Sequence, residues 1–577
     1  MRKVLTTAVF AVVALAMLAP PVLAQAPAPK VTITGLFDQV TTAGRNFYDG
    51  NYGRDNDREW YARTRFRPDF TFEVGRTKAV LGLEIDLMYG QGGSNDGGFP
   101  GNSTGFAGGF AGGTKGATNG ALDLNTDVGG MIEIKWAYTE FDLTGKDSIL
   151  PFIPVLTVAR AGGQPFGTIG NYKVLYANGD FAGLDLYTTF TPEIKNHLAF
   201  VVVEDQLAGG NRALANVRTN RGEDYAFILS PEITPIKGLD IKPVVSWFHA
   251  DGTTSSNSRR NSVNVRTAGT QVAGGAFVGS GGMNSGTATG GGNAAGDATN
   301  HEDRYTIGVD ARWRMGPFGL DPSLFYQTGP YYTQAQRSNG AVTRVKGDTA
   351  AWLADIIGSW QAGPLLVEAR GVYTTGNKAR DNLALSKRYF EPLDLDTGYW
   401  AGWASILALG IDYFNGGGGA NQGLDTGIGY DRYGRMGFGF RVTYNVTPAF
   451  AVYGTINPTW AAEKVDTDTG CGATTVAQAN AGCTTRLTVN DRSWVEGDSR
   501  YIGTELDLGV TWRFAPNVAL DLLGAYLFAG NALNTAECVA LGGAGVGTGN
   551  PCGTGGTVVR RDANDAYQAT ARVRLSF

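Results

Sequence analysis

The amino-acid sequence predicts an all-β fold, a transmembrane antiparallel β-barrel of about 18 strands. Many short segments alternate apolar and polar residues, as strands with one apolar face do. The connections between these segments alternate between short turns and long loops rich in Gly, Asn and Ser. This alternation is typical of a membrane barrel. The chain is 43% hydrophobic and has 84 glycines, yet after its first residues no apolar run approaches the length of a transmembrane helix.

The first residues have the pattern of a secretory signal peptide. Arg2 and Lys3 precede an apolar run of roughly 16 residues, shorter than the ~20 that a spanning helix needs. Val22-Leu23-Ala24 then places small residues at the −3 and −1 positions of a cleavage site. We therefore expect a signal peptide at 1–24 and one barrel domain at 25–577, with a retained anchor as the alternative.

The clearest hairpin lies near the start of the barrel. Apolar residues at alternate positions of 62–74 are interleaved with Arg63, Arg65 and Arg67, and a tight turn at 75–78 leads into a second alternating strand. Later hairpins repeat the design with proline in the turn, at Gly316-Pro317, Thr447-Pro448 and Ala515-Pro516. Proline suits these turns because it cannot donate to a strand ladder.

The last strand alternates without a fault from Tyr567 to Phe577 and ends on an aromatic residue. It resembles the closing strand of bacterial outer-membrane proteins, which runs down to the periplasm. Both termini are then periplasmic, short turns are periplasmic and long loops are extracellular. The predicted strands lie near 31–41, 58–74, 78–89, 131–143, 153–161, 181–191, 197–206, 223–231, 239–250, 304–315, 320–329, 349–361, 365–376, 435–446, 450–461, 501–514, 518–529 and 563–577.

One apolar segment, Trp403–Phe414, does not fit this scheme. As a wall strand it would make the number of strands odd and reverse the later strand directions. Trp400, Trp403, Leu407 and Ile411 recur at helical spacing, so we place a helix inside a long loop at 377–434. The alternatives are barrels of about 16 or 20 strands.

Two further stretches resemble Gram-negative outer-membrane porins. Residues 31–40 contain an aromatic residue, a glycine and an Asp, as the opening strand of that family commonly does. Leu156–Gly167 resembles the strand that leads into the family's third loop, which folds into the lumen. The resemblance implies a constriction at 162–180, with Gln164, Phe166, Tyr172 and Lys173 as lining residues. Three residues separate Arg160 from Gln164, so the alignment is loose and an ordinary surface loop is the alternative.

The resemblance implies a passive diffusion channel for small hydrophilic solutes or ions in a Gram-negative outer membrane, in contact with its lipid. Porins of this family are often trimers, so a homotrimer is an open expectation. The alternative function is a barrel sleeve around a partner such as a secreted cytochrome. We expect no enzymatic activity, because the sequence shows no set of nucleophile, base and orienting residue. We also expect no cofactor or nucleic-acid partner, and no glycine run joins a strand to a helix as a phosphate-binding loop would.

Charged residues on the polar faces of the strands are the predicted pore lining. They either set the selectivity of the lumen or brace the wall by ion pairing. They are Arg63, Arg65, Arg67, Glu84, Asp86, Arg312, Arg314, Glu368, Arg370, Arg435, Arg441, Arg513, Arg572 and Arg574.

The loops hold two further candidates. Cys471 and Cys483 lie in one loop and Cys538 and Cys552 in another. A secreted route favours disulfides, and local pairing within each loop needs the least ordering. Two DxDxG motifs, with Asp394 and Asp396 and with Asp466 and Asp468, are weak Ca²⁺ candidates because neither has a downstream Glu. Solvated turns are the simpler interpretation, and we assign no metal.

Overall fold

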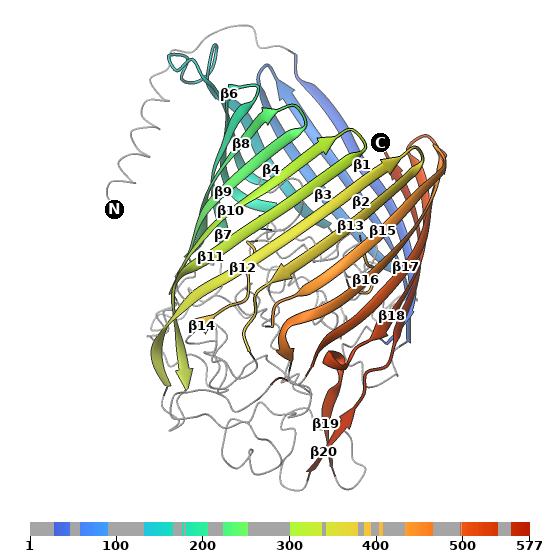
Figure 1. The fold of residues 1–577 in the computed structure, drawn as a ribbon. Coiled ribbons are helices and arrows are strands. Elements are labelled where there is room, and N and C mark those ends of the chain that lie inside the picture. Colours follow the sequence, from blue (N-terminus) through green and yellow to red (C-terminus); the bar gives the residue numbers. More distant parts are fainter. Residues whose placement is uncertain are drawn as a thin grey trace.

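The computed structural model describes residues 28–46, 58–89, 132–165, 176–177, 180–205, 223–251, 301–336, 342–378, 386–393, 403–407, 433–465, 497, 499–540 and 556–577. In this part of the chain, consecutive antiparallel strands form one closed sheet (Figure 1). The first and last wall strands pair over ten residues each, from Leu36 with Ser576 to Arg45 with Tyr567, which closes the ring. The predicted all-β barrel is confirmed.

The wall has 18 strands, because the sheet of 19 described strands includes one two-residue strand, β14, that is not part of the wall. The wall strands are β1 (Lys30–Arg45), β2 (Arg58–Val74), β3 (Thr77–Tyr89), β4 (Ile132–Thr144), β5 (Leu156–Pro165), β6 (Asp180–Thr191), β7 (Ile194–Asp205), β8 (Glu223–Ile236), β9 (Leu239–Asp251), β10 (His301–Met315), β11 (Phe318–Gln336), β12 (Val342–Ala362), β13 (Leu365–Thr374), β15 (Met436–Thr447), β16 (Phe450–Val465), β17 (Ser499–Ala515), β18 (Val518–Ala529) and β21 (Ala566–Ser576). Each overlaps one predicted strand, so the alternatives of 16 and 20 are wrong.

Three short strands lie outside the wall. β14 (Ser386–Lys387) pairs in parallel with β12. β19 (Thr535–Ala540) and β20 (Gly556–Arg561) form a separate hairpin. This hairpin follows a 3-10 turn, η5 (Asn531–Leu533), and projects beyond one rim of the barrel (Figure 1). The sequence pattern predicts loops at these residues, so the three short strands were not predicted.

Most short turns gather at one rim, where the C-terminus also lies (Figure 1). Gly316 and Gly363 each open a two-residue turn with φ of 56° and 58°, the left-handed region that glycine adopts at little cost. Proline follows both glycines. At the same rim, Phe577 and Gly35 exchange backbone hydrogen bonds of 2.9 and 3.0 Å. The two described ends of the chain are therefore held together at the short-turn rim.

The two faces of the wall differ in polarity. Outward side chains are apolar and exposed: Leu508 is 71% exposed and Ile307 is 56% exposed. The residues next to them in sequence on the inward face, Asp507 and Thr306, are 6% and 0% exposed. A charge on the outer face would cost about 2–4 kcal/mol at the centre of a bilayer, so this polarity suits a lipid environment. No helix among the residues described is long and apolar enough to cross a membrane.

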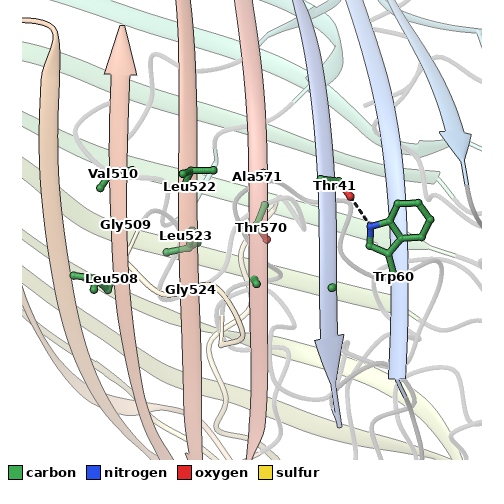
Figure 2. Close-up of a pocket in the computed structure, with 12 residues that line it drawn as sticks. Thr41, Trp60, Leu508, Gly509, Val510, Leu522, Leu523, Gly524, Thr570 and Ala571 are labelled. Atoms are coloured by element: carbon green, nitrogen blue, oxygen red, sulfur yellow. Dashed lines mark hydrogen bonds between the residues drawn. The ribbon is translucent and has the colours of Figure 1, made fainter. Parts of the chain in front are cut away.

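A shallow groove of about 530 Å³ runs along the outer wall where the barrel closes (Figure 2). Small residues such as Gly524, Ala569 and Ala571 are part of its lining, and the larger side chains of Leu508 and Trp60 also line it. The Trp60 indole donates a hydrogen bond of 2.8 Å to the Thr41 hydroxyl across the β1–β2 pair (Figure 2). The groove follows from small residues on neighbouring strands.

The described part of Trp403–Phe414, for which the sequence predicts a place outside the wall, is not a wall strand. Trp403–Leu407 forms a turn with no regular helix, so the predicted helix is wrong for these five residues. Residues 408–414 lie outside the described part of the chain. All five residues of the turn are buried, which explains the apolar spacing that was interpreted as helical.

Candidate functional site: the barrel interior

Ion pairs join neighbouring strands on the inner face of the wall. Arg370 donates to both carboxylate oxygens of Asp355 at 3.1 and 2.8 Å, and Arg572 donates to both of Asp38 at 2.7 Å. The partners are diagonal neighbours, which long side chains can reach across a sheet. Similar pairs join Arg65 and Arg67 to Glu84 at 2.8 and 3.0 Å, Arg441 to Glu368 at 2.6 Å and Arg574 to Asp521 at 2.6 Å.

The other predicted lining residues lie near the short-turn rim, are buried, or have side chains outside the described set. Arg312 pairs with Asp240 at 3.0 Å and Arg314 pairs with Asp321, both arginines being exposed near the short-turn rim. Arg513 is exposed at the same rim. Arg435 is 2% exposed, and its backbone N–H donates to the Thr374 hydroxyl at 2.8 Å. The side chains of Arg63 and Asp86 are outside the described set. The geometry agrees with bracing of the wall, while an effect on selectivity stays a prediction.

Two described parts of the connection between β13 and β15 lie inside the barrel. We call its described inner parts, 386–393 and 403–407, the infolded segment. Lys387 contacts Glu302 of β10 at 2.6 Å and Glu391 at 2.7 Å, and Arg304 contacts the same two carboxylates at 3.3 and 2.5 Å. All four side chains are at most 2% exposed. Two cations and two anions thus form a neutral cluster that attaches the segment to the wall.

Further hydrogen bonds hold the same part of the infolded segment. Gln327 of β11 donates to the backbone oxygen of Glu391 at 2.7 Å and accepts from its N–H at 2.9 Å. Tyr389 is fully buried beside the cluster, and its burial together with the nearby Glu391 carboxylate raises the pKa of the Tyr389 phenol well above its usual range. This part of the segment therefore lies against β10, β11 and β12.

The second part of the infolded segment contacts a different arc of the wall. Three consecutive backbone N–H groups, of Ser405, Ile406 and Leu407, donate to the Glu505 carboxylate of β17 at 2.7, 2.6 and 2.6 Å. Asn457 of β16 donates to the Trp403 carbonyl at 3.0 Å. The described parts of the connection are therefore attached to the wall at two places, and they occupy part of the interior.

A second connection also reaches inward, between β5 and β6. The Tyr176 hydroxyl donates to Ser246 of β9 at 2.8 Å, and its carbonyl accepts from Leu393 N–H at 2.9 Å. The Tyr176 ring lies 5.8 Å from that of Phe325 and 6.3 Å from that of Phe390. Tyr176 falls within the predicted constriction at 162–180 but was not among its predicted lining residues.

Of the four residues predicted to line a constriction at 162–180, one is buried in β5 and three lie outside the described residues. Gln164 is buried in β5, and its amide donates to the backbone oxygens of Arg160 and Gly183 at 3.2 and 3.4 Å. Phe166, Tyr172 and Lys173 lie outside the described residues. No local signal in the sequence marks Tyr176, because its partners are distant along the chain.

Part of the inner face is apolar. Inward residues of the wall, such as Ile228, Phe325 and Leu353, are buried in one cluster with Phe390 and Leu407 of the infolded segment. Burial of this surface favours the inward position of the segment, at roughly 25 cal/mol per Å². Alternation alone predicted a polar inner face, so this apolar patch was missed.

Several predicted sites fall outside the residues described. They are the signal peptide at 1–24, the side chains of Cys471, Cys483, Cys538 and Cys552, and the acidic motifs with Asp394, Asp396, Asp466 and Asp468. Within the described ranges, no three His, Cys, Asp or Glu residues gather as metal ligands would.

The chain matches no family model and no curated protein, but solved structures match it. A BenF-like porin from Pseudomonas fluorescens Pf-5 is 9% identical with a TM-score of 0.41, over 95% of this chain and 98% of that one. OccK10 (OpdN) from Pseudomonas aeruginosa is 9% identical with a TM-score of 0.39, over 94% and 99%. OccAB1 from Acinetobacter baumannii is 12% identical with a TM-score of 0.38, over 95% and 97%.

Proposed function

We propose that the chain is an outer-membrane channel of the porin type, through which small hydrophilic solutes or ions diffuse passively. One observation supports this most: a closed 18-strand barrel has an apolar outer face and an ion-paired inner face, and an infolded segment narrows its interior. Barrels of this size have room for an aqueous channel. The strong attachment of the segment suits a selective channel more than a wide pore.

The other expectations about the chain are part of this proposal. The signal peptide at 1–24 would direct secretion, and the short-turn rim with both described ends would face the periplasm. The loop disulfides and a homotrimer remain expectations from the sequence and the family. A sleeve around a partner protein gains no support from the structure, since the infolded segment occupies interior space that a partner would need.

Planar-bilayer recording of the purified, folded protein tests the proposed channel. We expect discrete conductance steps, because the ion-paired inner wall is polar enough to hold water. The matched control is the same preparation after heat unfolding, which should give no steps. Folded barrels that insert into the bilayer without conducting would contradict the proposal.

Glu84→Gln should shift the channel toward anions. Glu84 contacts Arg65, Arg67 and, at 3.7 Å, Lys135, which also pairs with Asp180 at 3.0 Å. Removing this carboxylate leaves the group with one more positive charge, in a wall where fixed charges bias ion passage. The reversal potential in a salt gradient measures the shift.

The matched control for this substitution is Glu73→Gln, whose ion pair with Lys30 is exposed at the rim and should leave the reversal potential unchanged. An unchanged potential in Glu84→Gln would show that the pair only braces the wall. Reversing Arg65 and Arg67 to Glu is a poorer test, because it would place three carboxylates together in a buried site.

A further inference from the structure

Glu505 is placed to control the infolded segment. Its side chain points inward from β17 and is fully buried at 0% exposure. Its Oε1 accepts hydrogen bonds from the N–H groups of Ser405 and Ile406, and its Oε2 accepts one from Leu407. One carboxylate thus satisfies three consecutive backbone donors of a turn about a hundred residues away in sequence.

Other described contacts also hold the turn. The Ser405 hydroxyl donates to the Gln568 amide oxygen at 3.0 Å, and the Trp403 ring lies 4.5 Å from the Arg441 guanidinium carbon. With the Asn457 bond, the turn is attached to β15, β16, β17 and β21. Glu505 accepts three backbone hydrogen bonds of the turn through one carboxylate, and hydrogen bonds to charged groups contribute about 1.5–3 kcal/mol.

We propose that Glu505 is a positioning residue that sets the width of the channel by fixing the turn at 403–407 against the wall. This inference rests on the proposed channel function. An unsatisfied buried N–H costs about 1–3 kcal/mol, so three such donors inside a barrel need a strong acceptor. Glutamine has the same shape but one oxygen and an NH₂ group, so it would set a donor against a donor. The turn would then leave the wall and fluctuate in the lumen.

The first experiment measures hydrogen exchange in the unmodified protein. The amides of Ser405, Ile406 and Leu407 belong to no strand, yet they should exchange as slowly as the ladder amides of β17. Fast exchange at these three positions would overturn the proposal. This measurement needs neither a variant nor a conducting channel.

The second experiment combines E505Q with a reporter. Ser405 is 1% exposed, so S405C should react slowly with a water-soluble thiol reagent, and roughly tenfold faster or more once E505Q replaces the second acceptor oxygen by a donor. Mapping of the labelled peptide separates this site from the four cysteines already in the sequence. The matched control is E232Q, which removes another inward carboxylate whose ion pair, with Lys242 at 2.8 Å, does not involve the turn.

Single-channel recording supplies the functional readout. E505Q should switch between current levels where the unmodified protein holds one steady level, and E232Q should not. Steady current in E505Q, or an equal rise in labelling with E232Q, would overturn the positioning role. An unmodified protein that shows protected amides and no current would instead overturn the proposed function.

Discussion

Replacing residues 379–431 by a short glycine-serine linker is expected to raise the single-channel conductance several-fold. The replacement removes the infolded segment and leaves every wall strand intact. Its two ends already meet: a Cβ on Gly376 would lie 2.0 Å from the carbonyl carbon of Tyr433, and Thr374 N–H donates to the Arg435 carbonyl at 2.7 Å. A short linker therefore spans the gap without strain on the β13–β15 pair.

The replacement also leaves no new net charge at the ion-pair cluster that attaches the segment to β10. Lys387 and Glu391 leave together, and Arg304 keeps its contact with Glu302 at 3.3 Å. The apolar inner patch becomes wet, which lowers stability, but the ladder bonds that hold the wall remain. Conductance in planar bilayers is the measurement.

The control for this replacement is an equivalent exchange of residues 536–560, which removes most of the β19–β20 hairpin outside the lumen. It should leave conductance unchanged. If the shortened protein folds and conducts as the unmodified one does, the infolded segment does not lie in the path of the solute.

Lys387→Met is expected to weaken the attachment of the infolded segment to the wall by about 3–5 kcal/mol. This is the usual effect of removing one partner of a buried ion pair. Lys387 is 0% exposed and contacts two carboxylates that are 2% exposed. Without it, the described cluster keeps two buried carboxylates beside one cation, Arg304. Opening of the segment would then be roughly a hundredfold to a few thousandfold more frequent, and proteolysis within it correspondingly faster.

The control is Lys30→Met. Its pair with Glu73, at 3.1 Å, is exposed, so its loss should cost about 0–1 kcal/mol and leave the proteolysis rate unchanged. Equal proteolysis of the Lys387 variant and the unmodified barrel would show that the apolar patch alone holds the segment.

The strands were predictable because their pattern is local. The alternation along β2 or β21 is recognisable without reference to any other strand. The two-residue turns are recognisable from Gly316-Pro317 and similar pairs. The count of 18 followed from strand directions once the last strand was placed. The cross-strand pairing of Arg65 with Glu84 was also within reach, since both lie on adjacent predicted strands.

The interior was not predictable in the same way, because its contacts join distant residues. Lys387 and Glu302 are 85 positions apart, and Leu407 and Glu505 are 98. Buried residues at 403 and 407 produced a helical spacing, although a turn buries them equally well. Inward apolar residues such as Phe325 were hidden, because an alternating pattern does not reveal that both faces of a strand can be apolar.

The contact that closes the barrel has a consequence for how the protein is made. Arg572 and Asp38 are 534 positions apart, and β1 has no partner on one side until β21 arrives. During synthesis, both edges of the incomplete sheet therefore present unpaired backbone groups, which readily pair with other chains. Such late, long-range pairing is slow. The chain must be kept apart from its copies until its last strand is available, and the seam between β1 and β21 is the step that ends this exposure.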